Sequence, residues 1–443
     1  MINPYFMFAT GIENSNPTVN GGRTRIDEME KCGHYRHWRT DLELVRELGL
    51  SYLRYGVPLH RTYLGPDRFD WEFSDLSFGT LKQYDIVPIA DLCHFGVPDW
   101  IGDFQNPDFP DLFAAYARAF AERYPWVQLY TPVNEMLICA VFSAKFGWWN
   151  EQGRSDQTFV IALKHIAKAN VLAMREILEI RPDALFVQSE SAEYHHAEEP
   201  LAIGLAETRN QMRFLSLDLN YGRRLQSGMY EYLMDNGLTR AEYEFFLVHN
   251  LRHHCIMGTD YYRHNEHRIS ADGSSREVGD VFGYDEITRQ YYDRYRLPVM
   301  HTETNYPEGP AGDEAVEWLW RQWASALRVR NSGLPLVGFT WYSLTDQVDW
   351  DIALRQDRGT VNPLGLYDLD RQIRPVGRAY KQLIERWQTV LPVQSVCLMV
   401  PVVLPSEYEE AGATRRREWM REYHRAEQSF RQSGGQIVQQ ASD

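Results

Sequence analysis

The chain has 443 residues, of which 44% are hydrophobic and 24% are charged, a composition typical of a folded globular protein. Its formal net charge of −15 argues against a nucleic-acid-binding surface, which needs clustered basic side chains, and favours a neutral small-molecule ligand. No apolar run is long enough to span a membrane, and the first residues lack a signal-peptide pattern, so we expect a cytoplasmic protein with no membrane partner. The sequence leaves open whether the chain forms a homo-oligomer.

Eight short segments rich in β-branched and aromatic residues are predicted to be strands. They lie within residues 5–12, 50–57, 85–95, 127–135, 183–190, 254–262, 297–305 and 335–344. Between them, residues 40–49 are predicted to form a helix that starts with a capping box at Thr40 and Glu43 and stops at Gly49. Further helices are predicted over residues 111–124 and 314–330.

Eight strands alternating with helices predict an α/β fold, a TIM (β/α)8 barrel, in one domain over residues 1–390. An open doubly wound sheet also alternates, but the first strand is not followed by a Gly-rich phosphate loop. Residues 391–443 are charged, mixed in sign and rich in Gly and Gln at their end. They predict a short C-terminal extension made of a linker and a polar helical tail.

Two glutamates stand at the ends of predicted strands, where barrels of this type build their active sites. Strand alternation places Glu135 on the inward-facing side with Leu129, and Glu303 on the inward-facing side with Val299. A carboxylate pair across a cleft is the minimum apparatus for cleaving a glycosidic bond. One acid protonates the departing oxygen, and the other attacks or shields the anomeric carbon. The sequence therefore predicts a glycosidase.

Neighbouring polar residues are expected to support this pair. Arg54 is expected to keep Glu303 ionised, and Tyr262 to donate a hydrogen bond to the same carboxylate. Asn134 is expected to hold a sugar hydroxyl. Because sugar rings stack on aromatic faces while their hydroxyls need polar partners, further substrate-binding residues are expected at strand ends. These are His94, Trp341, Tyr342, Asp349 and Trp350.

An ordered series of motifs covers residues 6 to 385. It includes HYRHWRTDLELVRELGLSYLRYGVPLHRTYLGP, CHFGVPDWI, YTPVNEM, MGTDYY, HTETN and GFTWYSLTDQVDW. The series resembles glycoside hydrolase family 1, the β-glucosidase-like barrels of the large retaining clan. The resemblance implies that Glu135 is the acid/base and Glu303 the nucleophile of a retaining double displacement that uses no metal and no cofactor. It also implies that Arg54 and Tyr262 hold the nucleophile, while His94, Asn134, Asp349 and Trp350 contact the sugar.

The chain departs from the family pattern mainly at sugar-contact positions. The first-strand Gln of the family has no clear match, although Glu13 and Asn14 lie nearby as candidate substrate-binding residues. Other departures are Met136 for a Pro, Asp260 for an Asn, Asp349 for a Glu, Phe95 for a Trp, and Tyr342, preceded by Trp341, for a platform Trp. We therefore expect a divergent member with the same chemistry and an altered specificity.

The expected function is hydrolysis of a small or modified β-glycoside through a covalent glycosyl-enzyme intermediate. Two alternatives stay open: a transglycosylase with an alcohol acceptor, and a sugar-binding pseudoenzyme with an altered subsite. Retention of both glutamates argues against the pseudoenzyme. The last strand loop has no Lys/Arg cluster that would favour a 6-phosphoglycoside as substrate. Arg355 and Arg358 nevertheless keep that option open. The His pairs lack HExxH spacing, so no metal site is predicted.

Overall fold

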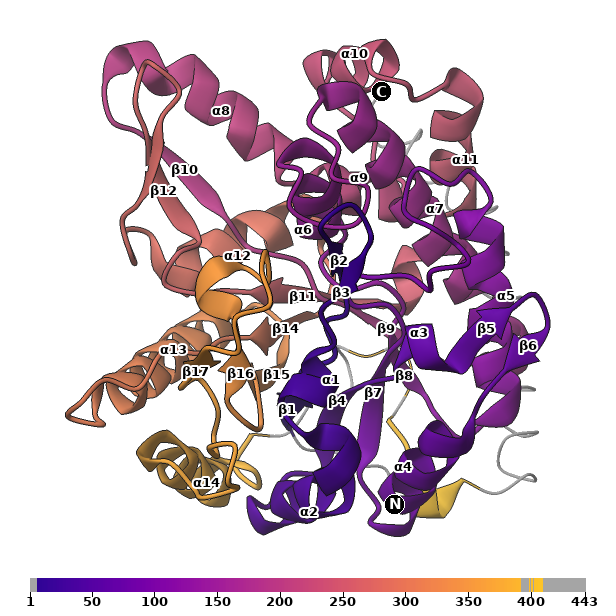
Figure 1. The fold of residues 1–443 in the computed structure, drawn as a ribbon. Coiled ribbons are helices and arrows are strands. Elements are labelled where there is room, and N and C mark those ends of the chain that lie inside the picture. The colour runs from indigo at the N-terminus through magenta and orange to yellow at the C-terminus, as the bar shows by residue number, and fades with distance from the viewer. Residues whose placement is uncertain (1–5, 392–397, 399, 401, 409–443) are drawn as a thin grey trace, which may run out of the picture.

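The computed structural model describes residues 6–391, 398, 400 and 402–408. Eight parallel strands close into a barrel in the order β1-β15-β14-β11-β9-β8-β7-β4 (Figure 1). They are β1 (Met7–Ile12), β4 (Tyr52–Gly56), β7 (Val87–Asp91), β8 (Leu129–Thr131), β9 (Leu185–Gln188), β11 (Cys255–Asp260), β14 (Val299–Glu303) and β15 (Leu336–Trp341). Each predicted strand segment contains one of these strands, so the prediction of a (β/α)8 barrel is confirmed.

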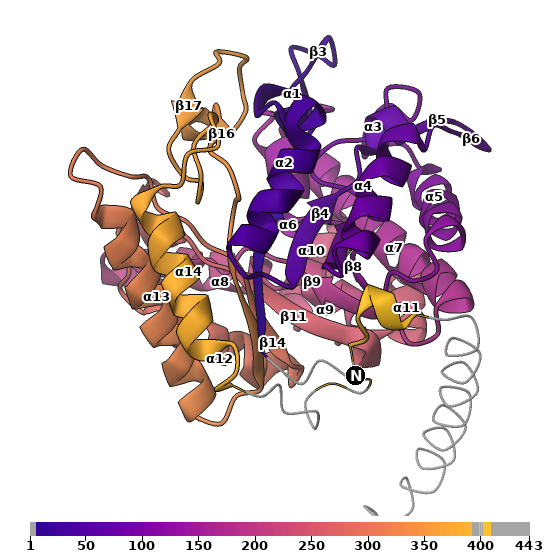
Figure 2. The same cartoon turned by 90° about the horizontal axis from the view of Figure 1, so that it is seen from below.

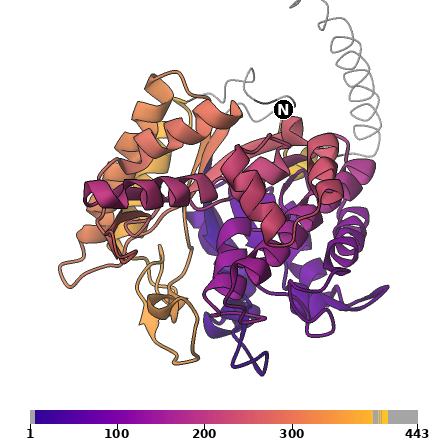
Figure 3. The ribbon, with the colours of Figure 1, turned by 90° about the horizontal axis from the view of Figure 1, so that it is seen from above.

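Helices surround the barrel, as a parallel sheet buried on both faces requires. They are α1 (Glu28–Lys31), α2 (His34–Glu47), α3 (Leu59–Thr62), α4 (Glu72–Gln83), α5 (Phe109–Arg123), α6 (Met136–Ala140), α7 (Asp156–Ile180), α8 (Ile203–Met212), α9 (Leu215–Asn220), α10 (Ser227–Asp235), α11 (Arg240–His249), α12 (Gly283–Tyr295), α13 (Glu314–Asn331) and α14 (Pro375–Trp387). In Figures 2 and 3 the orange helices of the last third of the chain lie together on one flank, and those of the first third lie on the other.

Short strands outside the barrel shape the loops. They are β2 (Thr18–Val19), β3 (Thr24–Arg25), β5 (Tyr63–Gly65), β6 (Arg68–Phe69), β10 (Tyr194–Ala197), β12 (Glu266–Ile269), β13 (Ser275–Glu277), β16 (Gln347–Val348) and β17 (Val361–Asn362). Strands β10, β12 and β13 form a small sheet that projects from one edge of the barrel beside α8 (Figure 1). None of the helices in the described residues is long and apolar enough to cross a membrane.

Helix α2 starts earlier than predicted. Its N-cap is Gly33, whose φ of 73° favours glycine, and Thr40 lies inside the helix, so the predicted capping box is wrong. The first turn is held by the buried side chain of His34, whose Nδ1 lies 2.8 Å from Asp41 Oδ2. The predicted end is close to correct, because α2 stops at Glu47 and Gly49 follows with a φ of 80°.

The amino ends of the barrel strands are covered by a segment near the C-terminus. Leu398, Val400 and Val402 are buried in one apolar cluster with side chains of the barrel interior, including Met7 and Ile89. Each such side chain contributes about 1.5–3 kcal/mol through burial. Part of the predicted linker therefore packs against the barrel, whereas the predicted polar helical tail lies outside the described residues.

Candidate active site

The carboxyl ends of the strands surround a cavity of about 370 Å³. Seven of the predicted site residues line it: Glu13, His94, Glu135, Tyr262, Glu303, Tyr342 and Trp350. These residues come from segments between positions 13 and 350 of the chain, and the barrel brings them together because parallel strands end on the same face.

Glu303 is the last residue of β14 and is held from two sides. Arg54 Nη1, from β4, donates to Oε1, and the Tyr262 hydroxyl donates to Oε2 at 2.7 Å. Arg54 also donates from Nη2 to Asn134 Oδ1 at 2.7 Å and to Asp91 Oδ2 at 3.2 Å. Burial opposes a charge on Arg54, but Glu303 and Asp91 outweigh it and raise the pKa of the guanidinium. The site therefore contains a fixed cation beside Glu303.

Glu135 reaches the cavity by a different route from the one that strand alternation predicts. Strand β8 ends at Thr131, and Glu135 follows four residues later with a left-handed φ of 38°, immediately before α6. Alternation from Leu129 does not therefore set its direction. Its backbone N–H donates to the Ser189 carbonyl at 3.0 Å, which fixes the turn. A non-glycine residue in this conformation is strained, and such strain is common at functional sites.

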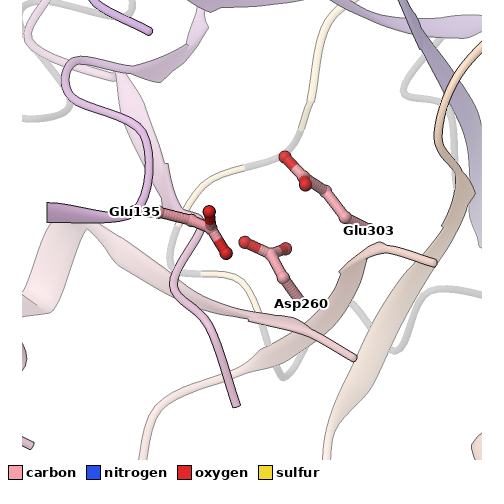
Figure 4. Close-up of side chains that lie close together, drawn as sticks. All are labelled: Glu135, Asp260 and Glu303. Atoms are coloured by element: carbon pink, nitrogen blue, oxygen red, sulfur yellow. The ribbon is translucent and has the colours of Figure 1, made fainter. Parts of the chain in front are cut away.

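A third carboxyl group lies beside the two glutamates. One carboxyl oxygen each of Glu135, Asp260 and Glu303 lies within 4.8 Å of the other two (Figure 4). This spacing is close to the separation of about 5 Å that suits a retaining glycosidase. Burial, followed by the neighbouring acidic groups Asp260 and Glu303, raises the pKa of Glu135 well above its usual value. The environment thus favours a protonated Glu135.

His94 and Glu13 are polar lining residues that interact electrostatically with Glu303. Asp91 Oδ2 lies 2.7 Å from His94 Nδ1, and Asn134 Nδ2 lies 3.0 Å from His94 Nε2. Burial alone lowers the pKa of His94, but the carboxylates of Asp91 and Glu13 outweigh it and raise the pKa. Asn134 is fully buried and does not line the cavity, so in the structure it orients Arg54 and His94 from behind.

Besides Asn134, three further predicted substrate-binding residues do not line the cavity. Asn14 packs against Gly56, and the Trp341 indole is buried with its N–H donating to the Leu364 carbonyl at 3.0 Å. Asp349 Oδ2 accepts from Lys31 Nζ at 3.0 Å, and its two oxygens also accept three backbone N–H bonds from residues 358–360. Burial opposes its ionisation, yet these donors lower the pKa of Asp349 to about 2.

The structure also adds cavity residues that the sequence does not predict. Gln347 lines the cavity in place of Asp349, and its side-chain N–H donates to Glu13 Oε2 at 2.8 Å. Further apolar lining residues are Ile138, Phe142 and Leu364, together with Phe95, which the sequence already places at a sugar-contact position. Further polar lining residues are Glu193, Arg263, His264 and Glu277. Asp260 lies beside the two glutamates without lining the cavity, and its place in MGTDYY is a signal in the sequence. No pattern in the sequence distinguishes Gln347.

Comparison with known proteins agrees with this geometry. The model of glycosyl hydrolase family 1 matches residues 17–247, more than half of the chain. The chain belongs to glycosyl hydrolase family 1. Among the similar relatives of this family 1 glycoside hydrolase, aryl-phospho-beta-D-glucosidase BglA of Bacillus subtilis is 22% identical over 384 residues, covering 72% of this chain and 78% of the relative. Beta-glucosidase A of Thermotoga maritima is 20% identical over 369 residues, covering 72% and 79%.

Solved structures resemble this family 1 enzyme along most of its length. The family 1 β-glucosidase from Thermotoga maritima superposes with a TM-score of 0.72 at 17% identity, covering 86% of this chain and 97% of that chain. This similarity supports the single-barrel architecture.

Proposed function

We propose that this family 1 enzyme hydrolyses small or modified, uncharged β-glycosides with retention of configuration, with Glu303 as nucleophile and Glu135 as acid/base. The observation that carries the proposal is that one carboxyl oxygen of Glu135 lies within 4.8 Å of one carboxyl oxygen of Glu303, and that both residues line one cavity. At this spacing a carboxylate reaches the anomeric carbon directly, whereas an inverting enzyme needs room for a water molecule.

In the first step, Glu303 attacks the anomeric carbon, the bond to the aglycone oxygen breaks, and Glu135 gives its proton to that oxygen. Arg54 and Tyr262 hold the attacking carboxylate in place, and the raised pKa of Glu135 keeps the proton available. In the second step, Glu135 takes a proton from a water molecule while the water oxygen attacks the anomeric carbon and releases Glu303. Water thus supplies the new oxygen and the proton that restores Glu135, and both carboxyl groups return to their starting states.

The cavity wall supports an uncharged sugar rather than a phosphorylated one. Three acidic side chains, Glu13, Glu193 and Glu277, line the cavity and would repel a phosphate group, against one arginine, Arg263, among the described lining residues. Arg355 and Arg358, the cations that kept a phosphoglycoside open, do not line the cavity. Arg355 Nε donates to the Ile352 carbonyl at 2.8 Å, and Arg358 pairs with Asp351 at 2.5 Å.

The proposal is tested with a panel of aryl β-glycosides and the variants Glu303→Ala and Glu135→Ala. We expect both variants to lose at least about 1,000-fold in kcat with unactivated substrates. Azide should rescue Glu303→Ala with an inverted glycosyl azide, and Glu135→Ala with a retained one on activated substrates. Full activity in both variants would refute the site assignment. Adding an alcohol to the wild type and analysing the products separates hydrolysis from transglycosylation.

A further inference from the structure

Asp260 stands between the two catalytic glutamates because of strand register. It is the last residue of β11, and its pairing partner on β14 is Glu303. Its backbone N–H donates to the Glu190 carbonyl at 3.0 Å, while the backbone N–H of Glu135 donates to the neighbouring Ser189 carbonyl at 3.0 Å. The same two-residue segment thus holds Asp260 and Glu135, and the Ser189 hydroxyl lies 2.8 and 2.7 Å from the two Asp260 oxygens.

The charge balance around Asp260 is unfavourable for a third anion. The titratable and charged groups that face it are Glu303, Glu135, Glu190, Arg54, Tyr262 and Tyr284. Arg54, the cation in this set, already pairs with Glu303 and Asp91. Within the described residues, no ion pair joins Asp260 or Glu135 to a cationic side chain. Since the nucleophile must be ionised, an ionised Asp260 would lie uncompensated beside it.

We propose, on the basis of the proposed function, that Asp260 is a positioning residue that works uncharged. Bound to Ser189, it fills the space between the two glutamates without adding a second negative charge. During glycosylation the single negative charge passes from Glu303, which becomes an ester, to Glu135, which has lost its proton to the leaving group. Asp260 keeps its own proton throughout, and none of its bonds break. Its burial beside Glu303 raises the pKa of Asp260 to about 8, in agreement with a neutral group at working pH.

Asp260→Asn is the decisive variant, because an amide keeps the size of the side chain and an acceptor for Ser189 but cannot ionise. If Asp260 is neutral in the working enzyme, the substitution removes no charge. The alkaline limb of the pH profile of kcat/KM should then keep its wild-type position or move to higher pH. The kcat at pH 6 should stay within about threefold of wild type. Asp260→Ala, which leaves Ser189 unpaired and opens space, should lower kcat by about tenfold or more at every pH.

The rival account, in which an ionised Asp260 keeps Glu135 protonated by repulsion, predicts the opposite shift. Removing that charge would move the alkaline limb of Asp260→Asn to lower pH by at least half a unit. Such a shift, or a loss of kcat as large as in Asp260→Ala, would overturn the proposal. Glu151→Gln is the matched control, because burial also raises the pKa of Glu151, to about 7, but Glu151 is not among the charged groups that face Asp260 or Glu135. Glu151→Gln should keep the alkaline limb of wild type.

A spectroscopic readout separates this proposal from the proposed function. The infrared difference between wild type and Asp260→Asn should contain the carbonyl band of a protonated carboxylic acid at pH 6, and the band should disappear with a midpoint near pH 8. Its absence at pH 6 would overturn the neutral Asp260 even in an active enzyme. Failure of a 2-fluoro glycoside to label Glu303 would instead overturn the proposed reaction and leave the infrared result unaffected.

Discussion

Arg54→Lys separates the geometry of the buried cation from its charge. The guanidinium binds Glu303, Asp91 and Asn134 with a rigid fork, whereas an ammonium is a point donor on a flexible stem. A lysine that stays with Glu303 loses the other two contacts, and hydrogen bonds that involve a charged group contribute about 1.5–3 kcal/mol each. If about 3 kcal/mol of this is lost in the transition state, kcat/KM falls about 150-fold.

The assay is steady-state hydrolysis of an aryl β-glycoside at pH 6, together with thermal denaturation of each variant. Arg181→Lys is the matched control, because Arg181 is also buried and pairs with Asp183 but precedes β9 at the opposite end of the barrel. We expect it to lose stability and keep kcat/KM within about threefold. If Arg54→Lys keeps kcat/KM within threefold, the fork does not position the nucleophile and our reading of the site fails.

Three further outcomes follow from the packing. In Gly11→Ala the new Cβ would lie 2.1 Å from the Tyr342 ring, so we expect KM to rise about tenfold, whereas Gly79→Ala, with nothing within 4 Å, should leave KM unchanged. Val400→Ala should lower the free energy of unfolding by about 2 kcal/mol in urea titration without changing kcat, and an unchanged midpoint would contradict the packing of this segment. Because burial raises the pKa of Glu190 to about 8, its protonation stabilises the fold at low pH, and this contribution is lost as pH rises from about 4.5 through 8. Glu190→Gln should therefore reduce the slope of unfolding free energy against pH by up to about 1.4 kcal/mol per pH unit in this range. An unchanged slope would contradict the raised pKa of Glu190.

The sequence predicts the barrel well because its strands are buried on both faces. Such strands appear as apolar runs that need no long-range information, and all eight predicted segments contain a barrel strand. The start of α2 could not be predicted from helix signals, because a left-handed Gly33 and the buried His34–Asp41 contact replace a capping side chain. Glu303 was found through its strand position, which the structure confirms as the end of β14.

The remaining side-chain directions depend on contacts distant in the sequence. Glu135 lies beyond the regular part of β8, so its direction follows from a backbone bond to Ser189 and not from alternation. Asp349 turns away from the cavity because Lys31 and the loop of residues 358–360 bind its carboxylate, and Gln347 takes its place. Neither the direction of Glu135 nor that of Asp349 could be predicted from neighbouring residues in the sequence, because their partners reach them only in the folded chain.

The backbone of Ser189 and Glu190 has a consequence for how such a site diverges. Their carbonyls bind the main-chain N–H groups of Glu135 and Asp260, so peptide groups, which every sequence provides, fix where these two residues leave the backbone. Side chains lining the cavity can therefore be exchanged without resetting that distance. Substitutions of Phe142 or His264 that admit a new aglycone should therefore leave the backbone positions of Glu135 and Asp260 unchanged.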